Sequence, residues 1–254
     1  MSSKPRDIRL IPVAFRDEIL PGDDLVEKLL LSLKHQNKSL LDGDVLVIKH
    51  KIISKAEGRL VLLNSLQPTA KAAGWAKRHR LEGRIVTLAL QESKRIVRQR
   101  NGVLITETKH GFVCANSGVD VSNVDGGRSA VLLPHDPDHS AQRLRAEIKS
   151  TLKISVAVII SDSFGRPWRE GLTEAAIGVA GMKPLRDYRG RRDPHGYKLH
   201  ATIDAVADEL ACAAGLVCAK LNRTPACIVR GFRYDKGPGS ARELIRPAKR
   251  DLFR

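Results

Sequence analysis

One apolar run constrains the fold of this chain more than any other stretch. Residues 156–160 read VAVII, and all but Ala157 are β-branched, which is typical of a buried strand. Asp162, Ser163 and Gly165 follow at once, so we expect the strand to end in oxygen-bearing side chains and a glycine turn. Ligands of α/β proteins usually bind at such a sheet edge, which favours a metal or phosphate site. The alternative is a surface turn in which Asp162 only caps a helix.

Three side chains beyond that turn suit an anionic ligand. Arg166 and Arg169 offer guanidinium forks that match phosphate and carboxylate groups. Trp168 offers a flat surface on which a ring could stack. A tryptophan that packs against the protein after Pro167 explains the same residue equally well.

The charge of the chain favours anionic partners. Its 254 residues carry 44 Lys+Arg against 28 Asp+Glu, a formal net charge of +16. Such an excess favours nucleic acid, an anionic membrane surface or small polyanions such as nucleotides, and composition leaves these three open. The densest basic cluster, KRIVRQR at residues 94–100, has the spacing of one face of a helix.

The cysteines and the apolar runs predict a reducing cytoplasm. The four cysteines show neither a C-x-x-C pair nor zinc-like spacing, and Cys212, Cys218 and Cys227 lie in apolar runs that predict buried free thiols. The first residues lack the apolar core of a signal peptide, and no run is long enough to span a bilayer. A cytoplasmic protein without a membrane partner is therefore expected.

Strands alternate with helices along the chain, which predicts an α/β or α+β fold. Strands are expected at residues 8–14, 45–48, 103–106, 111–115 and 156–160 and within 224–232. Helices are expected at residues 25–35, 69–79, 84–98, 141–152 and 202–219, with a basic amphipathic helix at 240–254. Residues 171–182 suit a strand or a helix. Because neither a repeat nor a Pro/Ser-rich linker interrupts the chain, we expect one continuous region over residues 8–250, with no readable boundary between lobes.

A second set of oxygen-bearing side chains follows the strand expected at residues 111–115. The segment NSGVDVSNVDGG places Asp120, Ser122, Asn123 and Asp125 there. Two strands that both run into such residues predict a divalent hard cation shared between them. Asx-turn chemistry is the alternative, because loops are built from the same residue types.

The segment KHKIISKAEGR follows the strand expected at residues 45–48. One interpretation is a turn in which Lys55 is a point charge for a nucleotide phosphate, and the other is a solvated helix start, which the spacing alone favours. The chain contains neither GxxxxGK[ST] nor GxGxxG after a strand. A nucleotide site here would therefore require an unusual fold.

Five segments together resemble one enzyme family. DGDVLVIKHKIISKAEGR, CANSGVDVSNVD, LLPHDPD, ISDSFGRPWREG and ATIDAVADE occur in the order seen in the coenzyme F420-0:L-glutamate ligases, and the resemblance runs over residues 11–232. It implies an F420-ligase-like α/β fold with two interleaved lobes and an intertwined homodimer. It also implies that L-glutamate is joined to F420-0 through an acyl phosphate, with GTP as co-substrate and GDP and phosphate released. Mg²⁺ or Mn²⁺ is implied as cofactor, with a second ion or K⁺ possible, and further glutamates follow through γ-linkages.

The resemblance assigns roles to residues of this chain. It implies metal ligation by Asp120, Asp162 and Ser163. It implies nucleotide contacts by Pro12, Val13, Ala14, Phe15, His50, Lys51, Lys55 and Asn123. Because phosphoryl transfer depends on charge neutralisation, we expect Arg166 and Arg169, with Lys55, to act in catalysis beside the two aspartates. The substrates are all anions, which agrees with the basic composition.

One position departs from the family pattern. After the helix that begins ATIDAVADE, archaeal members carry a glycine-rich segment with an acidic residue that joins the metal site, whereas this chain has Lys220. A lysine repels a cation, so either the metal site has fewer protein ligands or Lys220 contacts phosphate directly. The departure also leaves another nucleotide in place of GTP open.

Two other functions compete with this one. The first is the same ligase chemistry on a carboxylate other than F420-0. The second is nucleic-acid binding, which the charge favours; however, aromatic residues are only 4% of the chain and no recognised binding module is present. We therefore expect small-molecule substrates and no nucleic-acid partner.

Overall fold

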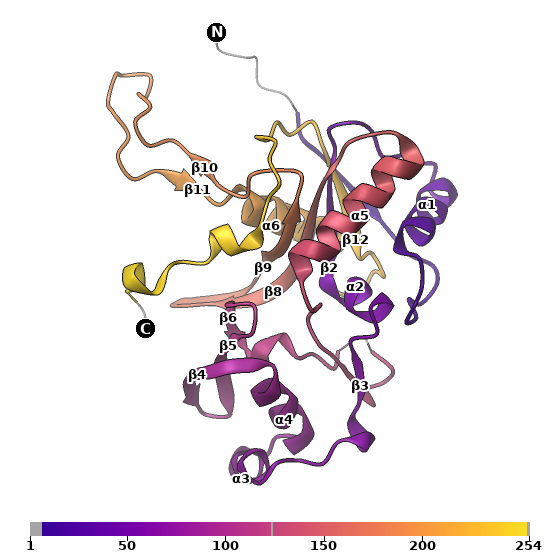
Figure 1. Cartoon of the computed structure of the whole chain (residues 1–254), viewed down its shortest axis with the longest axis vertical. Coiled ribbons are helices and arrows are strands. Elements are labelled where there is room, and N and C mark those ends of the chain that lie inside the picture. The colour runs from indigo at the N-terminus through magenta and orange to yellow at the C-terminus, as the bar shows by residue number, and fades with distance from the viewer. Residues whose placement is uncertain (1–6, 123, 253–254) are drawn as a thin grey trace.

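A five-stranded sheet is the central element of the fold. The computed structural model describes residues 7–122 and 124–252 (Figure 1). The sheet has the order β1-β12-β2-β8-β9 and consists of β1 (Arg9–Val13), β12 (Ala226–Arg230), β2 (Val45–Lys49), β8 (Ala157–Arg166) and β9 (Arg169–Ala180). β2 and β8 are parallel, and the other neighbouring pairs of this sheet are antiparallel. The predicted mixed α/β class is therefore confirmed.

Four helices belong to the same lobe, which we call the sheet lobe. They are α1 (Leu25–His35), α2 (His50–Ala56), α5 (Pro137–Leu152) and α6 (Val206–Cys218). Both α5 and α6 pack against β9, with α5 in front of the sheet in Figure 1 and α6 behind it. Side-chain caps set two helix starts, because Asp24 accepts hydrogen bonds from the first turn of α1 and Asp136 does the same for α5.

A smaller lobe is inserted between α2 and α5. It contains β3 (Leu60–Leu62), η1 (Leu63–Ser65), α3 (Ala70–His79), α4 (Gly83–Gln91), β4 (Ser93–Arg100), β5 (Val103–Thr108), β6 (Val113–Ala115), η2 (Asn116–Gly118) and β7 (Ser129–Val131). Strand β3 pairs with β7, and β4, β5 and β6 form a three-stranded sheet. Figure 1 shows this lobe below the central sheet.

The main hydrophobic core lies in the sheet lobe. Leu46, Ile48, Ile159, Ile160 and Ile228 come from three neighbouring strands and are almost fully buried. Each such side chain contributes about 1.5–3 kcal/mol through burial. Helices cover the parallel pair β2 and β8, which explains why both strands read as continuous apolar runs. The smaller lobe has separate clusters of its own.

The remaining elements lie outside these two lobes. Strands β10 (Arg186–Asp187) and β11 (Ile203–Asp204) form the base of an arm that extends away from the sheet lobe in Figure 1. The short turns η3 (Ala241–Leu244) and η4 (Ala248–Arg250) are near the C-terminus. The basic helix predicted for residues 240–254 is wrong, since Pro247 cannot continue a helix.

The strand that begins in the VAVII run does not end there. Strand β8 continues through Asp162 and Ser163 because β9 supplies a hydrogen-bonding partner as far as Arg166. The hairpin turns at Pro167 and Trp168, where Trp168 has φ of 56°. Asp162 is therefore neither at a strand end nor a helix cap. The same pairing settles residues 171–182, most of which belong to β9.

The basic cluster at residues 94–100 is also a strand. The predicted helix over residues 84–98 begins as α4 but ends at Gln91, and β4 follows with β5 as its partner. The expected hairpin of residues 103–115 is confirmed as β5 and β6. Pairing in the three-stranded sheet overrides the helical spacing of the charges.

The cysteines are free, as predicted. Cys218 and Cys227 are buried, whereas Cys212 is only partly buried. None of the helices in the two described ranges combines the length and apolar character that a membrane span requires.

Candidate active site

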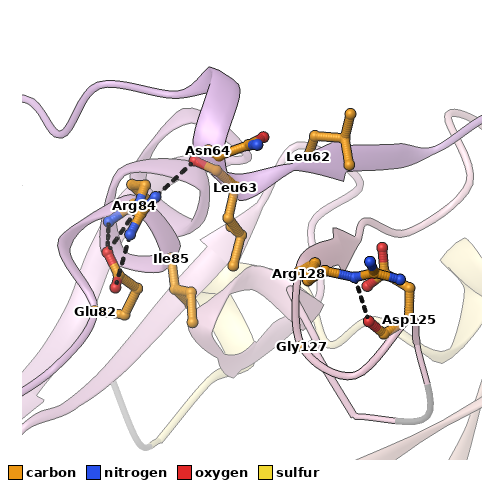
Figure 2. Close-up of a pocket in the computed structure, with 9 residues that line it drawn as sticks. All are labelled: Leu62, Leu63, Asn64, Glu82, Arg84, Ile85, Asp125, Gly127 and Arg128. Carbon is orange, nitrogen blue, oxygen red and sulfur yellow. Dashed lines mark hydrogen bonds and ion pairs between the residues drawn. The ribbon is translucent and has the colours of Figure 1, made fainter.

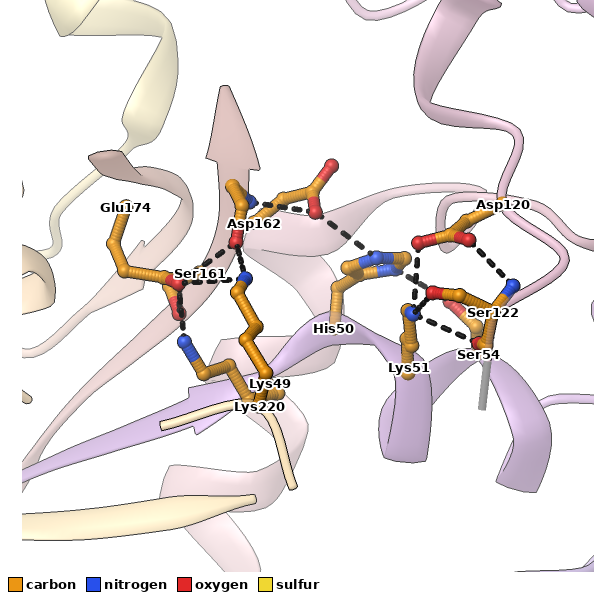
Figure 3. Close-up of polar contacts among 11 residues, drawn as sticks. Lys49, His50, Lys51, Ser54, Asp120, Ser122, Ser161, Asp162, Glu174 and Lys220 are labelled. Carbon is orange, nitrogen blue, oxygen red and sulfur yellow. Dashed lines mark hydrogen bonds and ion pairs between the residues drawn. The ribbon is translucent and has the colours of Figure 1, made fainter. Parts of the chain in front are cut away.

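Three consecutive residues at the end of β2 each contact a different carboxylate (Figure 3). The nitrogen-to-oxygen distances are 2.5 Å for Lys49–Glu174, 3.3 Å for His50–Asp162 and 2.7 Å for Lys51–Asp120. The chain changes from strand to helix at Lys49, whose backbone is still extended, so successive side chains point in different directions. The tripeptide KHK thus links β8, β9 and the loop after η2 in one charged cluster.

The Asp162 side chain is less exposed than that of Asp120. Its Oδ1 also accepts a hydrogen bond of 2.7 Å from the Ser163 N–H. Burial raises the pKa of Asp162, but the nearby His50 side chain and the hydrogen bond from the Ser163 N–H outweigh burial, so the pKa stays below its ordinary value. His50 itself is buried, and its Nδ1 lies 3.3 Å from Ser54 Oγ. The His50 ring is therefore held between Ser54 and Asp162.

Asp120 lies in the loop after η2 and faces the same region. Its carboxylate contacts Lys51 and accepts a 2.6 Å hydrogen bond from the Ser122 N–H. Burial raises the pKa of Asp120, and Lys51 with Ser122 lowers it further than burial raises it. The negative charge of Asp120 in turn raises the pKa of Asp162 slightly, and the two carboxylates contact adjacent residues, Lys51 and His50.

Glu174 is a site residue that the sequence analysis missed. It is opposite Ser163 in the β8–β9 ladder, and its side chain is only 7% exposed. Ser161 Oγ and Ser163 Oγ donate hydrogen bonds to it at 3.0 and 2.8 Å. Burial raises its pKa, but Lys49, Ser163 and Lys220 together hold the pKa below its ordinary value. A single acidic residue in the apolar segment GLTEAAIGVAG was the available signal, because carboxylates are rarely buried without a partner.

Lys220 reaches this cluster from the loop after α6. Its Nζ donates a hydrogen bond to Ser163 Oγ and lies 3.5 Å from Glu174 Oε1. The structure thus brings together six of the predicted residues: Asp120, Asp162, Ser163, His50, Lys51 and Lys220.

Other predicted residues do not touch the carboxylate cluster. Lys55 is buried on α2 and pairs with Glu18.

The residues predicted at the end of β1 also lie apart from the cluster. Val13 and Phe15 have buried side chains at and beyond the end of β1, so only their backbone could meet a ligand. The peptide groups there already have partners, since Pro12 O accepts from Lys38, Ala14 N and O pair with Gln36, and Phe15 N donates to Arg223 O. Asn123 lies outside the described residues.

The two arginines predicted for catalysis are at the tip of the β8–β9 hairpin. Arg166 donates a 2.5 Å hydrogen bond to Glu170 O, and Arg169 is exposed. Arg166 is four positions beyond Asp162 on an extended strand, or about 13 Å. The structure therefore places the two arginines and Asp162 at different points along one hairpin, and Asp120 lies on another segment, in the loop after η2.

The carboxylates of Asp120 and Asp162 fit a divalent ion whose remaining ligands come from substrate oxygens and water. In residues 7–122 and 124–252, no group of three or more His, Cys, Asp and Glu side chains is arranged to hold an ion alone. Asp120 and Asp162 nevertheless supply two hard, ionised oxygen donors whose mutual repulsion a cation would relieve. Mg²⁺ is typically held by one or two carboxylates together with substrate phosphates and water.

A cavity of about 750 Å³ lies apart from this cluster, in the smaller lobe (Figure 2). Its walls come from the β3–η1 segment, the start of α4 and the loop before β7. Its arginines are already engaged, because Arg84 pairs with Glu82 and Arg128 donates to Asp125 O. We therefore assign the chemistry to the carboxylate cluster, where ionisable groups converge, and not to this cavity in the smaller lobe.

The lowered pKa values predict how stability responds to acid. Asp120, Asp162 and Glu174 have lower pKa values when folded, so their stabilisation is complete above the unfolded-state values near 3.8 and 4.5 and is lost as pH falls through the folded values. In urea unfolding with a chelator present, the free energy of unfolding should change little from about pH 7 to 5 and fall below about pH 4.5. Glu174→Gln should show a shallower acid fall than the wild type, and equal slopes would contradict the prediction.

Comparison with known proteins finds relatives over nearly the whole chain. A family model described as F420-0:Gamma-glutamyl ligase matches residues 16–231. Proteins named coenzyme F420:L-glutamate ligase from Methanothermobacter thermautotrophicus and Methanopyrus kandleri are each 42% identical to the chain over 250 and 252 residues, which is 97% of this chain and 99% and 98% of theirs. One of the same name from Methanocaldococcus jannaschii is 44% identical over 214 residues, 84% of this chain and 85% of its own. With a carboxylate cluster on the matched segments and these relatives over nearly its full length, the chain belongs to the F420-0:gamma-glutamyl ligase family.

Proposed function

We propose that this protein is an amide ligase that adds L-glutamate to coenzyme F420-0, with GTP and Mg²⁺ or Mn²⁺. The observation that carries the proposal is the KHK cluster, in which three adjacent residues hold three carboxylates on segments that the family match includes. Residues 8–250 would form one catalytic region. Further γ-linked glutamates are part of the proposal.

The chemistry requires a carboxylate to be activated before an amine attacks it. Phosphoryl transfer from GTP to the acceptor carboxylate forms an acyl phosphate and GDP; the glutamate amine then forms the amide bond as phosphate leaves. This transfer depends mainly on positioning and charge neutralisation. The divalent ion would neutralise phosphate charge when bound, and Asp120, Asp162 and Ser163 are the residues proposed to hold it.

The chain itself supplies cations for the remaining phosphate charge. Lys51 and Lys220 lie beside the proposed ion ligands, and Lys55 lies on the same helix as Lys51. His50 is buried against Asp162, so its proposed nucleotide contact would come from its backbone. Arg166 and Arg169 would act on an anion bound near the hairpin tip.

The proposed homodimer is supported by the same hairpin tip. Trp168 and Leu172 are 79% and 65% exposed there, and the arm based on β10 and β11 extends away from the sheet lobe (Figure 1). A second copy would cover apolar surface that one chain leaves in contact with water.

The test is a mass-spectrometric assay of the purified protein with F420-0, L-glutamate, GTP and Mn²⁺. We expect a mass gain of one or more glutamyl units that disappears without metal and is much smaller with ATP. Absence of product from folded protein that still binds GTP and Mn²⁺ would contradict F420-0 as acceptor. The same ligase chemistry on another carboxylate would then be the function to test.

A further inference from the structure

Lys220 is the most exposed cation of the charged cluster. Its side chain is 60% exposed, whereas that of Lys49, which contacts the same carboxylate, is 19% exposed. Lys220 extends from the loop between α6 and β12 and holds Ser163 Oγ and Glu174 from the solvent side. It can therefore leave the cluster by rotating its own side chain.

Glu174 does not depend on Lys220 for neutralisation. Lys49 Nζ is 2.5 Å from Glu174 Oε1, a full ångström nearer than Lys220 at 3.5 Å. Ser161 and Ser163 also donate hydrogen bonds to this carboxylate. If Lys220 moves away, Glu174 remains paired with Lys49 and hydrogen-bonded to the two serines, so no buried carboxylate is left without a cation.

The contact with Ser163 places Lys220 where it opposes an ion. Ser163 Oγ donates its only proton to Glu174 and accepts a hydrogen bond from Lys220. A divalent ion on the same oxygen would be within about 5 Å of the ammonium, where a double and a single positive charge repel strongly even in water. The ion and the Lys220 ammonium therefore compete for Ser163.

We propose that Lys220 is an exchangeable counter-ion of the active site. Its ammonium holds Ser163 and Glu174 while no divalent ion is bound, and it is displaced toward the phosphates of the nucleotide when an ion binds at Asp162 and Ser163. This inference rests on the proposed function, because it takes Ser163 as an ion ligand. It adds a competition between a side chain of the protein and the metal.

The test is titration of the purified full-length protein with Mn²⁺ alone, with free Mn²⁺ measured by electron paramagnetic resonance. Lys220→Met should tighten Mn²⁺ binding by about tenfold, as Coulomb's law gives for these charges about 5 Å apart in water. Lys220→Arg keeps the charge and should bind like the wild type. Lys77→Met, on an exposed position of α3, is the matched control for loss of one positive charge.

A double variant tests the role of Ser163. In a Ser163→Ala background the hydroxyl no longer holds the Lys220 ammonium beside the ion, so Lys220→Met should change Mn²⁺ affinity by less than about twofold. The inference would be overturned if Lys220→Met, with Ser163 intact, bound Mn²⁺ no more tightly than the wild type. The proposed function would still stand. Where Mn²⁺ alone does not bind, the titration is repeated with GDP present to supply phosphate oxygens. Absence of Mn²⁺ binding in every variant under both conditions would overturn the proposed metal site, and the inference with it.

Discussion

Replacing Asp162 by alanine is expected to lower the turnover of glutamate ligation more than about a hundredfold. Asp162 is held by His50 and the Ser163 N–H in its ionised form, so it is ready to ligate a cation. Its loss removes one of the two carboxylates proposed to hold the ion. Asp120→Ala should have an effect of the same order. The measurement is initial rate in the mass-spectrometric assay, with GTP and Mn²⁺ saturating for the wild type.

Two controls separate loss of the ion from loss of the fold. Asp162→Asn keeps the size of the side chain and should be as inactive as Asp162→Ala, because a neutral amide lacks the negative charge with which a carboxylate holds Mg²⁺ or Mn²⁺. Asp187→Ala removes an exposed carboxylate that pairs with Arg189 on the arm, and it should leave the rate unchanged. Near-normal turnover in a folded Asp162 or Asp120 variant would remove that residue from the metal site.

Replacing Lys49 by methionine is expected to cost about 3 kcal/mol of unfolding free energy. Glu174 is buried, and Lys49 is its nearest cation, so the variant leaves a buried carboxylate with a weaker partner. For a chain of this size that loss corresponds to a decrease in Tm of about 6–12 °C. Thermal and urea unfolding, followed by circular dichroism at about pH 7, measure the change.

A second substitution and a matched control sharpen this test. Lys49→Met combined with Glu174→Gln should recover most of the stability, because the neutral amide keeps hydrogen bonds to Ser161 and Ser163 without a buried charge. Lys109→Met is the matched control, because Lys109 is exposed and its partner Glu92 still pairs with Arg59. This variant should lower the free energy of unfolding by less than about 1 kcal/mol. If Lys49→Met costs no more than Lys109→Met, the Lys49–Glu174 pair does not stabilise the fold.

Local patterns predicted the elements that carry the site. The β-branched run at residues 156–160 forms a buried strand, and the run at residues 45–48 forms its parallel neighbour. A run of apolar, β-branched side chains is visible in the segment itself and favours a buried strand. These two strands can therefore be predicted without knowing which strands pair with them. Asp120, Asp162 and Lys51 could be named because each belongs to a long motif.

Pairing between distant segments decided the rest. Residues 93–100 have helical charge spacing but form β4 because β5 is beside them. Asp162 is within a strand and not at its end because β9 extends the ladder. Apolar burial alone thus located β2 and β8, whereas strand pairing decided that residues 93–100 form a strand and how far β8 extends.

The tertiary structure also decided which residues meet in the charged cluster. By itself, the sequence determined that KHK and Asp162 each come just after a buried apolar run and that Asp120 comes after the segment that forms β6, since neighbours in the chain remain neighbours in space. Only the register of β8 against β9 places Glu174 opposite Ser163, and only the return of the chain after α6 brings Lys220 to both. These contacts join residues that are 11 and 57 positions apart. Such contacts depend on how strands pair and loops close, and no local pattern of side chains encodes that geometry.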